Sequence, residues 1–135
     1  MKMIWLGAVV AIGSLFALYL VAQEVSANRA PLTFALDCAG GDCPLLKGMP
    51  QTSGMRGGAV RLKPGQSVGW HSTGQNEEAL TILKGSGAAN IQGQADVPFH
   101  EQMLVYIPPN TRHNVTNTGR EVLEYVWVVA PVSAK

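Results

Sequence analysis

Short hydrophobic runs alternate with turns rich in glycine, proline and asparagine from Gly58 onward. In this region the hydrophobic positions do not keep the period of a helix for more than a turn or two. Closely spaced short strands with such turns between them are typical of an all-β sandwich or barrel. The pattern predicts antiparallel strands over residues 59–62, 67–73, 79–84, 88–92, 104–107, 112–117 and 122–129.

Alternation within the third of these strands places a carboxylate among core positions. Glu78, Leu80 and Ile82 fall on one face of an extended chain. A buried carboxylate costs several kcal/mol unless it is paired or bound to a metal, so Glu78 is a candidate functional residue. Glu77 is expected to point away from the core as a solvated charge, and it is the alternative carboxylate ligand.

The last predicted strand, residues 122–129, is largely hydrophobic on both faces. Its side chains alternate between Leu123, Tyr125, Trp127 and Val129 on one face and Val122, Glu124, Val126 and Val128 on the other. A strand with two apolar faces is expected to be covered on both sides. A second copy of the chain would supply one cover, so we expect a homodimer. Trp70 and Tyr106 are expected to be core or interface aromatics.

The N-terminal residues are predicted to form a targeting or anchoring segment. Residues 4–22 carry no charge and follow Lys2. Val25 and Ala27 supply small residues at alternate positions, so residues 1–27 are predicted to be a signal peptide cleaved after Ala27. A membrane-spanning helix needs about 20 apolar residues, which leaves an uncleaved membrane anchor as the alternative. Both interpretations place the rest of the chain in the periplasm or elsewhere outside the cytoplasm.

Residues 28–58 are predicted to form an irregular arm, with one short strand at 32–36. The arm contains both cysteines, Cys38 and Cys43, separated by a segment that includes two glycines. In an exported protein such a close pair predicts a local disulfide. A loop this short removes unfolded-state entropy worth only about 2 kcal/mol. Two cysteines without a nearby histidine argue against a thiolate zinc site.

Charge and length narrow the possible partners. The chain has 135 residues, a single-domain length, with ten Lys and Arg residues against nine Asp and Glu residues. Nucleic-acid-binding proteins carry a clustered basic patch, and no long run of one charge occurs here. We therefore expect a small-molecule partner and no nucleic acid.

The three histidines suggest a metal site. His71 lies near the end of a predicted strand just before a turn, Glu78 directly precedes the next strand, and His113 lies near the start of a later one. Two imidazoles and one carboxylate form a three-ligand set that leaves open positions on iron, manganese, nickel or zinc. The alternative is that His71 and His113 are structural residues with ordinary hydrogen bonds. His100 lies in a predicted loop and is expected at the surface.

Two groups of residues reproduce the spacings of the two cupin motifs: Gly65, His71, Thr73, Glu78 and Gly85, then Pro108, Asn110, His113 and Asn117. The chain thus resembles a small single-domain cupin. The resemblance implies a jelly-roll barrel over residues 59–131 and a metal held by His71, Glu78 and His113. Thr73 stands where cupins usually carry another histidine ligand; it would bind weakly, hold a water ligand or simply pack. Gln102 and Asn110 replace glycines of the second motif.

Three functions are compatible with these features. The first is an exported metal-dependent enzyme, a dioxygenase or an isomerase, acting on a small molecule. The second is a non-catalytic module of the cell envelope that binds or senses a sugar or another small ligand. The third is a structural domain with a degenerate site, which the inward position of Glu78 disfavours. No feature of the sequence specifies the substrate.

Overall fold

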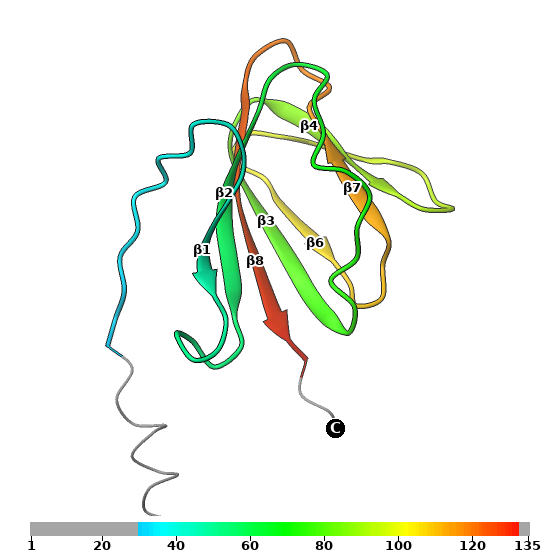
Figure 1. Ribbon diagram of the computed structural model, residues 1–135. Coiled ribbons are helices and arrows are strands. Elements are labelled where there is room, and N and C mark those ends of the chain that lie inside the picture. Colours follow the sequence, from blue (N-terminus) through cyan, green and yellow to red (C-terminus); the bar gives the residue numbers. More distant parts are fainter. Residues whose placement is uncertain (1–29, 133–135) are drawn as a thin grey trace, which may run out of the picture. The chain divides into compact units, whose positions relative to one another are not determined.

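The computed structural model describes residues 30–132 (Figure 1). Strands form its regular structure: β1 (Gly41–Lys47), β2 (Arg56–Leu62), β3 (Asn76–Lys84), β4 (Ser86–Ile91), β5 (Val97–His100), β6 (Leu104–Ile107), β7 (His113–Thr116) and β8 (Leu123–Pro131). They all belong to the compact unit that begins at Phe34. The described residues contain no helix, which confirms the all-β prediction.

The predicted signal peptide or anchor, residues 1–27, lies outside the described residues. Within residues 30–132, no helix is long and apolar enough to cross a membrane.

The strands form two antiparallel sheets. The larger sheet has the order β1-β2-β8-β3-β6, and the smaller has the order β5-β4-β7. Figure 1 shows β2, β8 and β3 side by side, with β4 and β7 in the second layer. The inner faces of both sheets supply the core, whose residues include Val60, Leu80, Ile82, Ala89, Phe99, Ile107, Val115 and Leu123. The alternation predicted for β3 is confirmed, because Glu78, Leu80 and Ile82 are all buried.

Two strands were not predicted, and both are sheet edges. β1 occupies part of the arm that we expected to be irregular, and it contains Pro44 beside a register shift. β5 lies where we expected a loop, and it contains Pro98. Proline lacks the N–H that a central strand must donate, so it is confined largely to edges and bulges. The prolines that are characteristic of edge strands are therefore also the residues that made the sequence predict loops here.

Two predicted strands are wrong or reduced. Residues 32–36 form no strand. Residues 67–73 form only isolated bridges, Ser67 with Thr116 and His71 with His113. Gly69 interrupts the segment between these bridges because its φ is +93°, a conformation that other residues rarely adopt.

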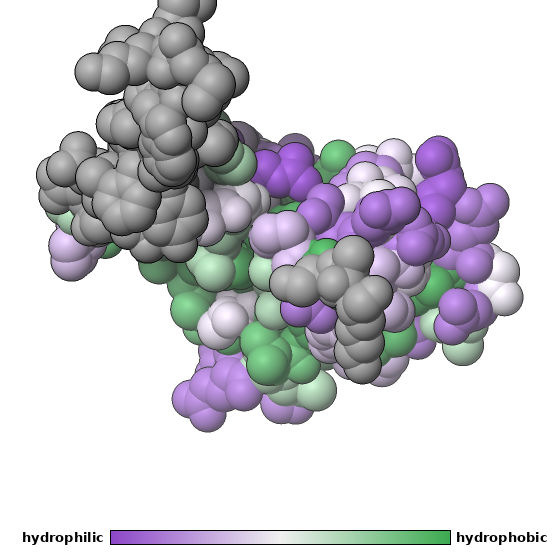
Figure 2. Space-filling model, turned by 90° about the horizontal axis from the view of Figure 1, so that it is seen from below, coloured by the Kyte–Doolittle hydropathy of each residue, from purple (hydrophilic) through white to green (hydrophobic). Residues whose placement is uncertain are grey.

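Part of the outer face of the larger sheet is apolar. Val126 and Val128 on β8 are half-buried, whereas Leu104 and Tyr106 on the edge strand β6 are exposed. Tyr125 faces the core and is buried. Figure 2 shows a different side of the molecule, seen from below, where apolar residues gather next to polar ones. Single exposed apolar residues are ordinary, but Leu104 and Tyr106 lie on one strand, in the same cross-strand rows as Val126 and Val128, with β3 between β6 and β8.

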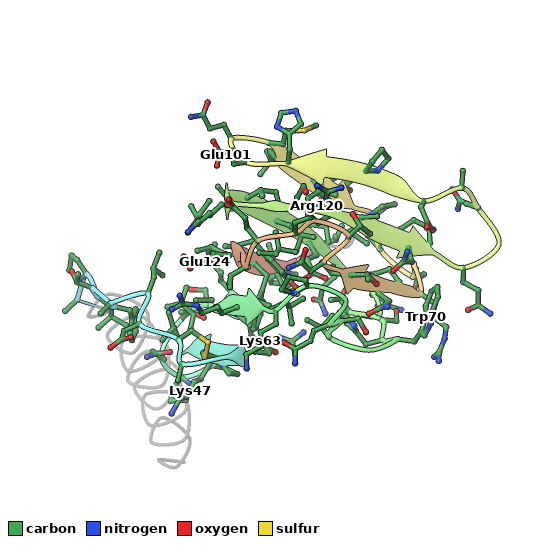
Figure 3. The ribbon with its side chains drawn as sticks, turned by 90° about the horizontal axis from the view of Figure 1, so that it is seen from above. Lys47, Lys63, Trp70, Glu101, Arg120 and Glu124 are labelled. Carbon is green, nitrogen blue, oxygen red and sulfur yellow. A yellow bond between two sulfur atoms is a disulfide. The ribbon has the colours of Figure 1, made fainter. Side chains whose placement is uncertain are left out.

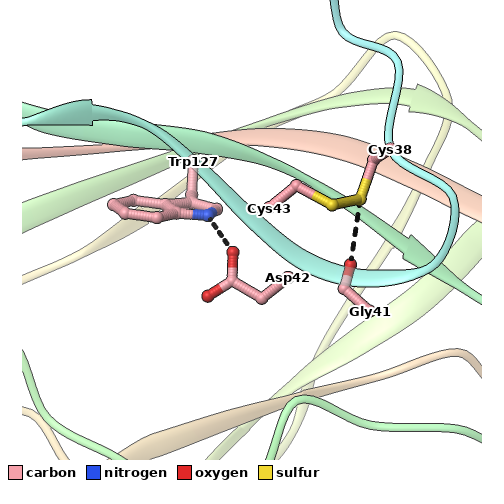
Figure 4. Close-up of a disulfide and its surroundings, with 5 residues drawn as sticks. All are labelled: Cys38, Gly41, Asp42, Cys43 and Trp127. Atoms are coloured by element: carbon pink, nitrogen blue, oxygen red, sulfur yellow. Dashed lines mark hydrogen bonds between the residues drawn. A yellow bond between two sulfur atoms is a disulfide. The ribbon is translucent and has the colours of Figure 1, made fainter.

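The predicted disulfide between Cys38 and Cys43 is present (Figure 4). Cys43 belongs to β1, so the bond ties the preceding arm to the first strand of the larger sheet. Next to it, the indole N–H of Trp127 on β8 donates a hydrogen bond of 2.8 Å to Asp42 Oδ1. The disulfide thus fixes the arm to β1, and the hydrogen bond joins β1 to β8.

Candidate metal site

The two motif histidines are held side by side by the backbone. The His71 N–H donates to the His113 carbonyl and the His113 N–H donates to the His71 carbonyl, both at 2.9 Å. This exchange makes them a hydrogen-bonded antiparallel pair. Their ring centroids are consequently only 4.3 Å apart.

Glu78 completes the cluster from the inner face of β3. One donor atom each from His71, Glu78 and His113 lies within 4.8 Å of the others. Donor atoms at about 2.0–2.2 Å from a single ion lie at most about 4.4 Å apart, so the three groups would have to draw closer together to bind one ion. Glu78 and His113 are buried, whereas His71 is partly exposed. Its neighbour Trp70 projects at the end of the molecule (Figure 3).

Backbone carbonyls determine which imidazole nitrogen faces the cluster. His71 Nδ1 lies 2.9 Å from the Gly69 carbonyl oxygen, and His113 Nδ1 lies 3.0 Å from that of Thr111. A carbonyl can only accept, so each Nδ1 carries the hydrogen. In the neutral rings Nε2 is therefore left with a free lone pair. Metal-binding histidines are commonly oriented in this way.

The buried pair of Glu78 and His113 lacks a satisfied hydrogen bond. Glu78 Oε2 and His113 Nε2 are 3.1 Å apart, an ion-pair distance when the ring is protonated. Their orientation is nevertheless not that of a hydrogen bond, and neither atom has another partner. With a neutral ring, two lone pairs face each other in a buried space, which is unfavourable. A cation between them would remove this cost, so the residues present fit a divalent metal.

Protons compete with the metal for the ring nitrogen of His113, so metal affinity should depend on pH. Burial lowers the pKa of His113, but Glu78 and the Thr111 carbonyl raise it more, so the pKa lies above the ordinary 6.5. Metal binding requires the neutral ring. Metal affinity should therefore begin to fall at a higher pH than an ordinary histidine would cause, and it should continue to fall on acidification.

The folding stability of the metal-free protein should change with pH in the opposite direction to metal affinity, falling as pH rises. A raised folded-state pKa contributes stability that is fully present below the unfolded value and is lost as pH rises through the folded value. Metal titrations and denaturant melts between about pH 5 and pH 8 would measure both trends. Metal affinity that stays constant on acidification to about pH 5 would contradict the prediction.

Asn114 is a positioning residue that the sequence did not reveal. Its Oδ1 accepts the Gly69 N–H at 2.9 Å, and the Gly69 carbonyl in turn holds His71 Nδ1. Asn114 thus orients His71 through one backbone unit. Its role shows only in its burial and in its hydrogen bond to Gly69, a residue far away in the sequence.

We predict that Asn114→Ala lowers metal affinity by about 10- to 100-fold, the usual effect of removing a residue that orients a ligand. Competition with a chromophoric chelator would measure it. Asn90→Ala is a suitable control, because Asn90 bonds to Asn114 but not to Gly69. Equal losses in both variants would indicate a general structural effect instead.

The other candidate residues lie apart from the cluster or have other partners. The Thr73 hydroxyl donates to the Asn76 carbonyl at 3.0 Å, so it stabilises the turn before β3. Glu77 accepts a hydrogen bond from the Tyr106 hydroxyl on the outer face. His100 is exposed, as predicted, and so is Arg112.

A cavity of about 180 Å³ opens beside the cluster. Its lining includes His71, Glu78 and Thr73, with Tyr125, Trp127, Val129, Asp42 and Arg56 among the others. Burial, aided by the Glu78 and Asp42 carboxylates, raises the pKa of Tyr125, so its phenol is neutral. Drug-sized ligands occupy pockets of about 300–1,000 Å³. The cavity therefore suits a molecule of a few non-hydrogen atoms.

Comparisons with known proteins agree with this architecture. The family model of the cupin domain (Cupin_2) matches residues 58–129. An oxalate-binding protein of Thermotoga maritima is 33% identical over 70 residues, which cover 52% of this chain and 57% of the relative. The polyketide synthase CurC of Streptomyces cyaneus is 27% identical over 84 residues, covering 62% of this chain and 53% of the relative. The chain thus spans little more than half the length of these curated relatives.

Among solved structures, a cupin 2 conserved barrel domain protein from Salinispora arenicola aligns with a TM-score of 0.56 and 27% identity. The alignment covers 76% of this chain and 87% of that one.

Proposed function

Since this chain belongs to the cupin family, we propose that it binds one divalent metal ion through His71, Glu78 and His113. The observation that carries the proposal is the buried, unsatisfied pair of Glu78 Oε2 and His113 Nε2. Three protein ligands leave positions open on iron, manganese, nickel or zinc. Those positions face a cavity in which a small molecule would bind.

A binding or sensing role is the function that the site supports best. When present, the metal supplies a Lewis acid that holds and polarises an oxygen of the ligand. The relative from Thermotoga maritima is named for oxalate binding, which supports a small ligand here. A metal-dependent enzyme, a dioxygenase or an isomerase, is the second candidate, favoured by the neutral Tyr125 phenol at the cavity, which can donate a hydrogen bond to a bound ligand.

Elemental analysis tests the proposal. Residues 28–135 purified without added chelator should retain close to one metal ion per chain, and a chelator should remove it. The metal-free protein should take up a single ion again. A protein that retains no first-row metal and takes none up would contradict the proposal. Turnover of bound ligand by the loaded protein would favour the enzyme, and binding without turnover would favour the sensor.

We also propose that the domain works outside the cytoplasm. The Cys38–Cys43 disulfide supports this location, because such bonds persist in oxidising compartments. Thiol labelling of non-reduced protein from its native compartment should leave both cysteines unmodified. Labelling of both would contradict the proposal.

A homodimer through the outer face of the larger sheet is the proposed assembly. Exposed Leu104 and Tyr106 on β6 support it, together with half-buried Val126 and Val128 in the same cross-strand rows on β8, one strand further in. Light scattering at micromolar concentration should give the mass of a dimer. Leu104→Glu should shift it to a monomer, whereas Val97→Glu, at an exposed position of the other sheet, should not. A monomeric wild type would refute the proposal.

A further inference from the structure

Arg56 is an exposed residue at the start of β2, on the strand face that continues into the barrel interior. On β2 it shares a face with Val60 and Leu62, which are buried in the core. Arg56 and Glu78 both pair with Val129 on β8, from its two sides. Arg56, Val129 and Glu78 therefore form one cross-strand row, with about 10 Å between the outer two Cα atoms. The arginine side chain lines the same cavity as His71 and Glu78.

Within the described part of the chain, no carboxylate neutralises this guanidinium. Arg61, on the opposite face of the same strand, pairs with Glu124, but Arg56 has no corresponding ion pair or hydrogen bond. The cavity's second carboxylate, Asp42, is engaged by the Trp127 indole. Moreover, the cross-strand neighbour of Arg56 on β1 is Lys47, and like charges in that position are destabilising.

Charge balance indicates the kind of ligand that would use Arg56. The charged side chains that line the cavity are Asp42, Glu78 and Arg56, besides the partly exposed His71. A divalent metal added to these groups, with neutral histidines, gives the cavity a net positive charge. An arginine guanidinium binds a carboxylate with two parallel hydrogen bonds. The apolar wall of Val129 lies between the two positive groups.

We propose that Arg56 determines specificity for a short dicarboxylate, one end of which binds the metal while the other carboxylate pairs with Arg56. This inference rests on the proposed metal site, and it adds the ligand class and the residue that selects it. The small cavity excludes long chains, and the metal and Arg56 at its two sides require two anionic ends. Trp127, fixed by its bond to Asp42 (Figure 4), forms part of the wall beside this ligand.

Calorimetric titration of the manganese-loaded full domain with oxalate, malonate and acetate tests the proposal. At least one dicarboxylate should bind the wild type at least about 10-fold more tightly than acetate does. Arg56→Gln should lower the affinity for that dicarboxylate by about 10- to 100-fold, as expected for losing hydrogen bonds between charged groups. The dicarboxylate affinity of Arg56→Lys should lie between those of the wild type and Arg56→Gln, because an ammonium keeps the charge but lacks the planar pair of N–H groups of a guanidinium. Acetate affinity should change little.

Arg61→Gln is the matched control, since Arg61 lies on the same strand but faces outward in a surface ion pair. It should leave dicarboxylate binding unchanged. Equal losses in Arg56→Gln and Arg61→Gln, wild-type affinity in Arg56→Gln, or no preference of the wild type over acetate would each overturn the assignment.

Metal content measured on the same samples separates this inference from the proposed function. Arg56→Gln should retain the wild-type metal content. If the wild type retains no metal, the proposed function fails. Arg56-dependent dicarboxylate binding by the metal-free protein would then still support the assignment of Arg56, and its absence would overturn it.

Discussion

Glu78→Gln should lower metal affinity by more than about 100-fold. Replacing residues that merely orient a ligand costs about 10- to 100-fold, and this substitution removes a ligand together with the negative charge that faces the ion. The amide keeps nearly the same volume, so the change is electrostatic rather than steric. Competition with a chromophoric chelator at neutral pH would measure the affinity.

Glu77→Gln provides the control for this prediction. It makes the same change one residue earlier, where the carboxylate bonds to Tyr106 on the outer face. Its metal affinity should match the wild type. If Glu77→Gln causes the loss and Glu78→Gln does not, the ligand assignment is wrong. Thr73→His should act in the opposite direction and tighten binding, because it places an imidazole in the cavity wall.

Leu80→Ala should reduce the free energy of unfolding by about 2–5 kcal/mol. Leu80 is 1% exposed, and it lies next to Glu78 on the inner face of β3, between Val105 on β6 and Trp127 on β8. Truncation leaves a cavity that the two flanking strands cannot close without breaking their ladders. Urea denaturation of the metal-free protein would measure the loss without a contribution from bound metal.

The same substitution at Leu83 is the control for packing. Leu83 belongs to the same strand, but it is 46% exposed. Leu83→Ala should therefore cost less than about 1 kcal/mol. Similar losses in the free energy of unfolding at both positions would show that Leu80 is not part of a tightly packed core.

The alternation of residues along the chain was enough to predict the all-β class and the inner face of β3. Glu78, Leu80 and Ile82 repeat at the period of a strand, and that period is a local property of the sequence. The turns were equally readable because glycine and proline carry their conformational preferences wherever they occur. The disulfide between Cys38 and Cys43 was predictable because the two cysteines are close in the sequence of a chain expected to be exported.

The edge strands could not be read in this way. β1 contains a proline and a register shift, and its residues do not alternate in burial. What makes it a strand is the neighbouring β2, which supplies hydrogen-bond partners along the ladder. An edge strand gains part of its structure from a partner that its own residues do not specify.

By itself, the sequence determined the fold class, the candidate ligands and their spacing within two motifs. Only the tertiary structure decided how those ligands meet. The reciprocal backbone bonds of His71 and His113, and the link from Asn114 through Gly69 to His71, join residues more than forty positions apart. The row of Arg56, Val129 and Glu78 likewise depends on the register of three strands. Such contacts follow from strand pairing across the whole sheet, which local residue preferences do not encode.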